Sequence, residues 1–405
     1  MLTFSRMRAM ALAGGLLSGV ALAQPAWTTT WIASQQPVWS EGELPLPTGL
    51  PESIDDATVV QHLRVSVGGP RVRLVLSNQY GRHPVHIGAI SAISAMHHAV
   101  RSVTFAGRGA IDVPAGGTVT SDPIELGVQA LGTLTVRMYL PRPATVESFH
   151  WDGRQTAEIA PGNQVGHAAV QQARTFQARL LLAAVDVETT RPAPTIVAIG
   201  DSITEGNGAT PDMNRRWPDQ LAERLASDHI SVLNAGISGD QLLRDGMGQA
   251  GVTRFQHDAL ALPHVRAVIV ALGINDIGWP GSTFAPGRKL PTLDELADGY
   301  RKLIAQAHAH GVRVIGATIT PFAGALDGSP IHGYASPEKE ALRQQVNRWI
   351  RTSGAFDAVA DFEGAVRDPA RPDRLLPAFD SGDHLHPGDQ GYAAMAAAID
   401  AAQLF

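Results

Sequence analysis

The stretch Ile196–Gly208 reads Ile-Val-Ala-Ile-Gly-Asp-Ser-Ile-Thr-Glu-Gly-Asn-Gly. A short apolar run ends in Gly200-Asp201-Ser202, two more glycines follow, and a helix-like segment covers residues 215–227. This order predicts a buried parallel strand, a tight turn and a helix. The turn would place Ser202 at the carboxyl end of a sheet strand, where α/β proteins hold their functional sites. Ser202 is therefore a candidate nucleophile.

The chain from residue 195 to 405 alternates between strand-like and helix-like segments. Apolar runs typical of strands lie at 196–199, 230–233, 267–272, 312–319 and, more weakly, 358–362. The segment 293–310 has a helical apolar face, and Thr292 and Glu295 form a capping box at its start. A second helix is predicted to begin at Ser336-Pro337, a cap residue followed by proline. The alternation predicts a three-layer α/β/α domain with a parallel sheet.

The chain before residue 189 has a different period. Between about 59 and 187, polar and apolar residues alternate in short runs separated by glycine- and proline-rich turns. Such runs predict an all-β sandwich of antiparallel strands. We assign it to a domain at 24–188, followed by a linker at 189–194 of the composition Thr-Thr-Arg-Pro-Ala-Pro.

The segment 24–54 is rich in tryptophan and proline. An extended segment pinned to a surface by its indole rings is one interpretation. A platform on which sugars stack is the other. Because tryptophan is usually largely buried, packing is the favoured interpretation.

The first 23 residues have the organisation of a secretory signal peptide. Arg6 and Arg8 precede the apolar run 10–21, and Ala21-Leu22-Ala23 is a small-residue cleavage site. The apolar run is too short for a membrane span, and no other stretch is long enough for one. We therefore expect a secreted protein, periplasmic or extracellular.

Composition excludes several function classes. The chain of 405 residues has a formal net charge of -6 and no long basic run, so no nucleic-acid footprint is present. It has no cysteine, which excludes disulfides, thiolate metal sites, a cysteine nucleophile and a lipoprotein anchor.

A serine nucleophile needs a base and a group that orients the base. His386 lies in Gly-Asp-His-Leu-His-Pro-Gly, residues 382–388, and Asp383 precedes it by three residues. Within one turn, that spacing lets the carboxylate reach the imidazole Nδ1. Taken alone, Asp-x-x-His is a weak signal, and the alternative is a turn aspartate beside a surface histidine.

The oxyanion formed on attack needs hydrogen-bond donors. Asn234-Ala235-Gly236 and Gly273-Ile274-Asn275-Asp276 each follow directly on an apolar strand. The Gly236 N–H, the Asn275 amide and the Ser202 N–H would make a hole with three donors. Each residue taken singly is more often an ordinary turn residue.

Together the four blocks resemble those of the SGNH, or GDSL, hydrolase superfamily in both residues and order. They are Gly200-Asp201-Ser202, Asn234-x-Gly236, Gly273-x-Asn275-Asp276 and Asp383-x-x-His386. Ile203 stands where the common motif has leucine, a conservative exchange. The resemblance covers residues 195–402 and implies a flavodoxin-like fold and ester or thioester hydrolysis. It implies a triad of Ser202, Asp383 and His386, and an oxyanion hole of Ser202, Gly236 and Asn275. The β part resembles, more loosely, the domain that precedes the catalytic domain in some secreted bacterial members.

Metal catalysis is a competing hypothesis. Three short histidine motifs could bind a metal, namely His97-His98, His308-x-His310 and His384-x-His386. None has a third ligand nearby apart from Asp383, which the triad uses. We expect no metal and no cofactor.

The leading hypothesis is a secreted serine esterase that acts through an acyl-Ser202 intermediate on short acyl groups, acetyl above all, carried by a small molecule or a polysaccharide. One alternative is a lipase or thioesterase for longer acyl chains. Another is a binding or adhesion protein with an inactive hydrolase domain, against which the intact set of five site residues argues. The natural substrate, the ligand of the β part and the oligomeric state do not follow from the sequence.

Overall fold

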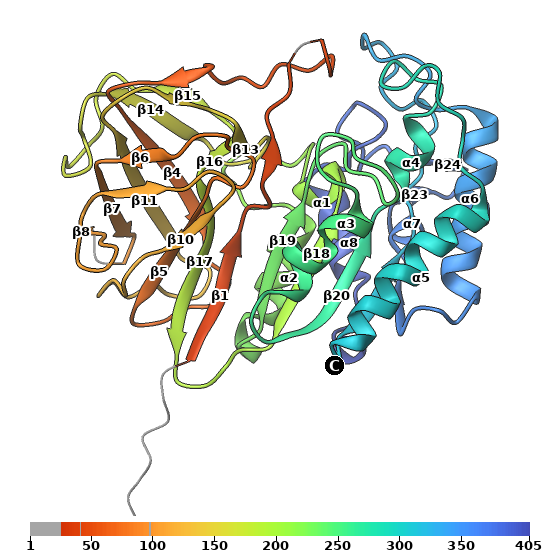
Figure 1. The fold of residues 1–405 in the computed structure, drawn as a ribbon. Coiled ribbons are helices and arrows are strands. Elements are labelled where there is room, and N and C mark those ends of the chain that lie inside the picture. The colour runs from red at the N-terminus through yellow and green to blue at the C-terminus, as the bar shows by residue number, and fades with distance from the viewer. Residues whose placement is uncertain (1–25, 41, 97–98) are drawn as a thin grey trace, which may run out of the picture.

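The computed structural model describes residues 26–40, 42–96 and 99–405. The predicted signal peptide, residues 1–23, and the motif His97-His98 lie outside the described residues. The described chain forms an all-β part up to Thr189 and an α/β part from Thr195 onward, which lie against each other (Figure 1).

The all-β part contains two larger sheets. The four-stranded sheet has the order β1 (Ala26–Ile32), β17 (Leu182–Thr189), β5 (Val72–Ser77), β10 (Thr118–Thr120). The six-stranded sheet has the order β15 (Arg174–Phe176), β14 (Ala157–Pro161), β4 (Ala57–Arg64), β11 (Thr133–Leu140), β7 (Ala89–Ser94), β8 (Val100–Ser102). Shorter strands are β2 (Gln36–Pro37), β3 (Ser53–Ile54), β6 (Val85–Ile87), β9 (Ile111–Val113), β12 (Ala144–Thr145), β13 (Ser148–His150) and β16 (Arg179–Leu180). All these pairings are antiparallel, and within residues 26–189 as described there is no α-helix.

The α/β part contains a parallel sheet of five strands in the order β19 (Ser231–Gly236), β18 (Thr195–Gly200), β20 (Val265–Ala271), β21 (Arg313–Ala317), β22 (Ala358–Ala360). In chain order this is 2-1-3-4-5, the flavodoxin-like order. Every residue of β18 is buried, as the apolar run at 196–199 predicts. The order reverses beside β18, so the carboxyl ends of β18 and β20 flank the crevice where such folds hold their sites.

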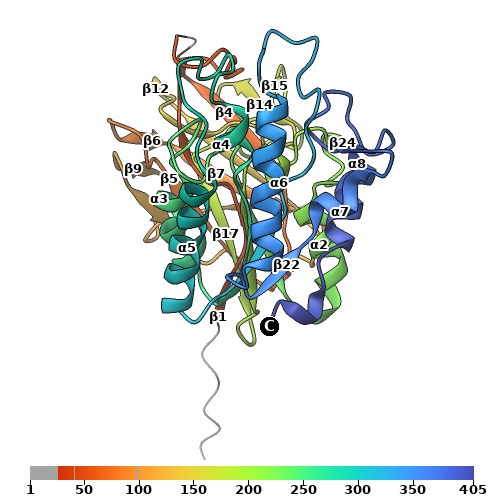
Figure 2. The same cartoon turned by 90° about the vertical axis from the view of Figure 1, so that its right-hand side faces the viewer.

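Eight helices accompany this sheet in the described chain: α1 (Ser202–Glu205), α2 (Trp217–Leu225), α3 (Gly251–Phe255), α4 (Ile274–Gly278), α5 (Leu293–Ala309), α6 (Pro337–Thr352), α7 (Phe362–Val366) and α8 (Asp389–Ala397). Helices α3 and α5 lie on one side of the sheet and α2, α7 and α8 on the other (Figure 2). The sequence prediction of both long helices is confirmed. Thr292 and Glu295 form the capping box of α5, and the Ser336 hydroxyl caps α6.

Tryptophan side chains of the segment 24–54 pack against the rest of the protein. Trp39 is 8% exposed, lies edge-on to Trp151 and donates from Nε1 to the carbonyl of Leu46 at 2.8 Å. Trp151 donates to the carbonyl of Pro47 at 3.1 Å. The two indoles therefore hold the loop that follows β2, which supports the packing interpretation. The first part of the segment 24–54 forms strand β1, which was not predicted from the sequence.

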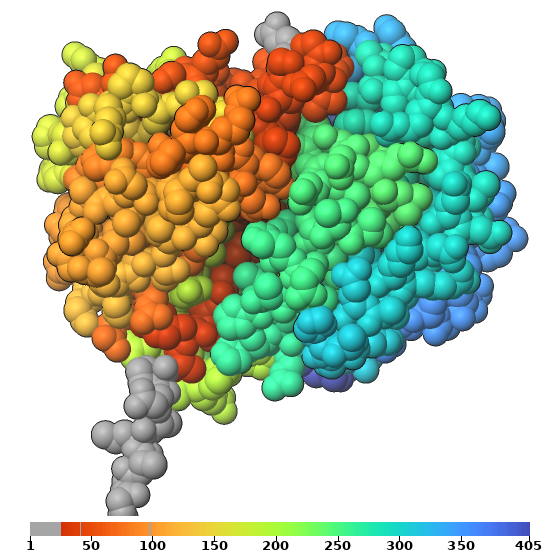
Figure 3. Space-filling view, in the orientation of Figure 1, coloured from red at the N-terminus to blue at the C-terminus, as the bar shows by residue number. Residues whose placement is uncertain are grey.

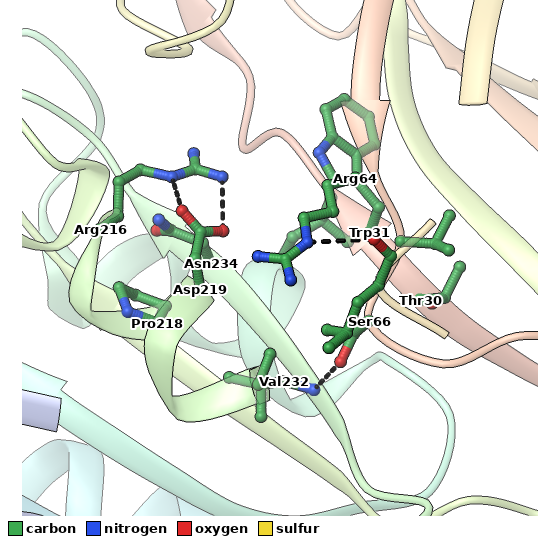
Figure 4. A pocket seen from close by; sticks show the side chains of 13 residues that line it. Thr30, Trp31, Arg64, Ser66, Arg216, Pro218, Asp219, Val232 and Asn234 are labelled. Carbon is green, nitrogen blue, oxygen red and sulfur yellow. Dashed lines mark hydrogen bonds and ion pairs between the residues drawn. The ribbon is translucent and has the colours of Figure 1, made fainter. Parts of the chain in front are cut away.

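The two parts meet along a long seam (Figure 3). The Ser231 hydroxyl of β19 donates to the carbonyl of Thr29 in β1 at 2.7 Å, and the Val232 N–H donates to the Ser66 hydroxyl at 2.9 Å. A small pocket on this seam, with Ser66 and Val232 in its wall, encloses about 30 Å³ (Figure 4). That volume suits a water molecule and is far too small for a substrate.

Candidate active site

The nucleophile candidate lies at the first position of α1, directly after β18. The Asp201 side chain caps this helix by accepting from the Ile203 N–H at 3.0 Å, and the chain leaves through Gly206 at φ 109°. A Cβ at Gly206 would meet the Arg216 side chain at 2.1 Å. Ser202 is 7% exposed and is held in a tight strand–turn–helix unit, as the sequence predicts.

The structure brings the predicted base and its orienting acid to Ser202. The Ser202 Oγ lies 2.8 Å from His386 Nε2, and His386 Nδ1 lies 2.6 Å from Asp383 Oδ2. With Nδ1–H donated to the carboxylate, Nε2 is the free acceptor for the serine proton. The arrangement is therefore the hydrogen-bonded chain that serine acyl transfer requires.

Asp383 is fixed independently of the imidazole. Its Oδ1 accepts from the backbone N–H groups of Leu385 at 2.9 Å and His386 at 2.8 Å. Burial alone would raise the pKa of Asp383, but the hydrogen bond from His386 and these backbone donors outweigh it and hold that pKa below its usual range. The carboxylate is thus ionised at any pH at which a histidine base is neutral. Asp383 is therefore more than a turn residue, because the turn holds its carboxylate in place to accept from the imidazole of His386.

Asn275 lies in the first turn of α4, at the end of β20, and is 3% exposed. Its Oδ1 accepts from the Tyr334 hydroxyl at 2.7 Å, and its Nδ2 donates to the carbonyl of Asp240 at 2.9 Å. These two hydrogen bonds fix the orientation of the Asn275 side-chain amide, because a hydroxyl donates to its oxygen and a carbonyl accepts from its nitrogen. One hydrogen of Nδ2 is left for an oxyanion.

Gly236 ends β19, and its N–H donates to the Asn234 side chain at 2.9 Å. To stabilise the oxyanion, the Gly236 N–H would therefore have to donate to it together with, or in place of, the Asn234 side chain. The structure also gives a second reason for glycine here. A Cβ at 236 would lie 2.3 Å from the backbone nitrogen of Glu205, so α1 packs directly on this residue. The Ser202 N–H, at the first position of α1, has no acceptor within the helix.

A buried arginine, which the sequence reading missed, ties these segments together. Arg254 donates to the carbonyls of Gly200 at 2.9 Å and Ala235 at 2.8 Å, one residue before each turn. It also pairs with Asp240 at 2.7 Å, and the Asp240 carbonyl holds Asn275. Burial is the main reason that the pKa of Asp240 is raised, to about 7. One guanidinium thus fixes the ends of β18 and β19 and the loop between β19 and α3.

Asp276 has a comparable structural role. Its carboxylate accepts from the backbone N–H groups of Leu242 at 2.6 Å and Leu243 at 3.0 Å. It therefore fixes the loop after β19 to α4 and does not face the nucleophile's partners.

Two of the three histidine motifs lie in the described chain, and their side chains have other hydrogen-bond partners. His384 Nδ1 lies 2.5 Å from Asp380, away from the His386 pair. His308 pairs with Asp357, and His310 bonds the carbonyl of Gln306 in its own helix. In the part of the chain that the structure describes, no cluster of three or more His, Cys, Asp or Glu residues could hold a metal ion.

A comparison with known protein families matches the part of the chain that contains these residues. Residues 198–394, which contain Ser202, Asn275, Asp383 and His386, match the model of the GDSL-like lipase/acylhydrolase family. The segment that contains these residues thus belongs to the GDSL superfamily. It is a carboxylic ester hydrolase. No curated protein matches the chain significantly.

The matches to solved structures cover about half of the chain. A carbohydrate acetylesterase from Sinorhizobium meliloti is 21% identical, with a TM-score of 0.39, and the match covers 52% of this chain and 100% of that one. An aryl esterase from M. smegmatis is 20% identical, with a TM-score of 0.40, and covers 51% and 96%. A GDSL-like lipase from Bacteroides thetaiotaomicron is 19% identical, with a TM-score of 0.38, and covers 52% and 87%. Similarity this low says nothing about the substrate of this chain.

Proposed function

We propose that the protein is a secreted serine esterase that removes short acyl groups, acetyl above all, from a polar and carbohydrate-type alcohol. The observation that carries the proposal is the chain of two hydrogen bonds, 2.8 Å and 2.6 Å, from Ser202 through His386 to Asp383. The division into a signal peptide at 1–23, a β-sandwich at 24–188, a linker at 189–194 and a catalytic domain at 195–405 belongs to the same proposal.

The reaction proceeds in two acyl transfers. His386 accepts the Ser202 proton as Oγ attacks the ester carbonyl, and the imidazolium is stabilised by Asp383. The tetrahedral oxyanion accepts from the Ser202 and Gly236 N–H groups and from Asn275 Nδ2. His386 then protonates the leaving alcohol, and the acyl-Ser202 is hydrolysed by water along the same route.

The burial of two aromatic side chains supports a short acyl group. Trp279 and Phe322, which could line an acyl pocket, are only 3% and 1% exposed. Trp279 stacks on Phe284 with ring centroids 4.7 Å apart, and Phe322 packs against Tyr334. Trp279 and Phe322 therefore offer little surface to a long acyl chain.

In the described chain, no helix has the length and apolarity needed to cross a membrane.

A cavity beside the triad loop, with charged residues in its wall, supports a polar alcohol. It has a volume of about 530 Å³, and its wall includes the charged residues Asp327, Glu340 and Arg374. The loop that forms much of it touches the triad, because the Leu326 N–H donates to the carbonyl of Asp383 at 2.8 Å. Acidic and basic side chains in the wall of such a cavity suit hydroxyl-rich substrates better than lipids.

The test is a series of nitrophenyl esters of increasing acyl length, measured beside acetylated xylan and pectin. We expect the highest kcat/KM for acetate and release of acetate from at least one polymer. A kcat/KM that rises steadily to long chains, without acetate from either polymer, would refute the substrate while leaving the triad intact. Ser202→Ala serves as the control for background hydrolysis.

A further inference from the structure

The seam between the two parts contains a buried polar network that reaches the catalytic loops. Its centre is Glu205, the last residue of α1 and three residues after Ser202, which is 1% exposed. His150, at the end of β13, is 5% exposed and reaches it from the β part. Two ionisable groups so deeply buried are costly unless each polar atom has a partner.

The Glu205 carboxylate uses both oxygens to join the two parts. Oε1 lies 3.1 Å from His150 Nε2 and accepts from the Asp152 N–H at 3.3 Å, both on the β part. Oε2 accepts from the Ser238 N–H at 2.7 Å and also from the Ser238 hydroxyl. Ser238 follows Gly236 by two residues, so the carboxylate spans from the β part to the predicted oxyanion loop.

The His150–Glu205 pair holds one shared proton. His150 Nδ1 lies 3.0 Å from the carbonyl of Ser34, and because a carbonyl only accepts, Nδ1 carries a hydrogen. The contact between Nε2 and Oε1 then needs one further proton, on either atom. Burial raises the pKa of Glu205 and lowers that of His150, which favours the neutral pair. The bridge thus crosses the seam without leaving a net buried charge.

The far end of the network is also anchored. Asn207 Nδ2 donates to the Ser238 hydroxyl at 2.6 Å, and the Ile237 N–H donates to the carbonyl of Gly200 at 3.0 Å. Ser238 is therefore fixed between the turn that carries the nucleophile and the turn that carries Gly236. Without Glu205, the backbone N–H and the hydroxyl of Ser238 would both lose their acceptor.

We propose that the β part completes the active site, with His150 as a positioning residue that acts through Glu205 and Ser238 on the oxyanion loop. The inference rests on the proposed esterase function. His150 contacts no reacting atom. His150 fixes the Glu205 carboxyl group, which in turn fixes the loop at Ser238. Displacement of catalytic groups by about 1 Å lowers the rate on the order of 10²-fold.

The test compares His150→Ala and His150→Gln with Arg64→Ala in the full chain. Arg64 pairs with Glu223 across the same seam at 2.8 Å but has no bond to the network, so its removal weakens the seam alone. The readouts are kcat and KM for nitrophenyl acetate, the inhibition constant of a phenylboronic acid that mimics the tetrahedral state, and the thermal unfolding midpoint.

We expect His150→Ala to lower kcat by about 10- to 100-fold, to weaken the boronic acid in parallel, and to change KM less than threefold. His150→Gln, whose neutral amide can accept from or donate to Glu205, should fall between His150→Ala and the wild type. A kcat for both His150 variants no lower than that of Arg64→Ala would overturn the inference, as would a change confined to KM. Should His150→Ala not fold, His150→Gln against Arg64→Ala decides the question in the same way. A wild-type protein without esterase activity would instead refute the proposed function.

Discussion

Asn275 allows the oxyanion hole to be tested against a matched control. Asn275→Ala removes one amide whose Oδ1 accepts from Tyr334 and whose Nδ2 donates to the Asp240 carbonyl, leaving one hydrogen for the oxyanion. Loss of one such donor typically lowers kcat by about 10²- to 10³-fold, or about 3–4 kcal/mol. Because the donor acts on charge that develops in the transition state, KM should change much less.

The control is Asn347, which is fully buried in α6. It accepts from the Ile319 N–H at 2.7 Å and donates to the Ile319 carbonyl at 2.8 Å. Asn275→Ala and Asn347→Ala therefore each lose two buried hydrogen bonds, with a comparable loss of unfolding free energy of about 1–3 kcal/mol. Only Asn275→Ala should lose kcat in the folded enzyme.

The assay measures kcat and KM for nitrophenyl acetate, with the folded fraction determined by urea unfolding. A raised KM with unchanged kcat would show that Asn275 binds the substrate and does not stabilise the oxyanion. Equal losses of kcat in the two variants would show that the effect is one of stability.

Two further predictions concern the triad. A fluorophosphonate probe should label Ser202 alone, as mass spectrometry of the labelled peptide would show. Label at Ser238, or label that persists in Ser202→Ala, would contradict the assignment. Asp383→Asn should lower kcat by up to about 10⁴-fold and keep the circular dichroism spectrum. Because the folded-state pKa of Asp383 is depressed, its stabilisation is present above about pH 4, the usual range of an unfolded aspartate, and is lost as the pH falls further. The difference in urea stability between wild type and Asp383→Asn should therefore shrink between pH 7 and pH 3, and a difference that stays constant would contradict this reading.

Much of the fold of the α/β part could be predicted from local sequence patterns. The apolar run before Ser202 and the capping box at Thr292 each depend on residues that are close in sequence, and both appear in the structure where they were expected. The structure also brings Ser202, Asp383 and His386 within hydrogen-bond distance, although their catalytic roles stay predictions.

The residues that were missed act over long sequence separations. Arg254 and Glu205 resemble ordinary charged residues of a helix in the sequence, and only the fold shows that both are buried. His150 lies 55 residues before Glu205, in strand β13 of the all-β part. The two side chains nevertheless meet, with His150 Nε2 and Glu205 Oε1 3.1 Å apart. The pairing of β1 with β17 links Ala26 to Thr189, and no local pattern announces it.

The position of β1 has a consequence for the order of folding. Its sheet partner is β17, the last strand of the β part, so the four-stranded sheet cannot close until the chain up to Thr189 is present. The Thr29 carbonyl in β1 also accepts from Ser231 in β19, which joins that sheet to the edge strand of the parallel sheet. Contacts between such distant segments impose a large loop-closure entropy before they give any stabilisation, so proteins dominated by them fold slowly. We therefore expect the first strand of this chain to pair late in folding, after β17 and β19, which lie beside it, have formed.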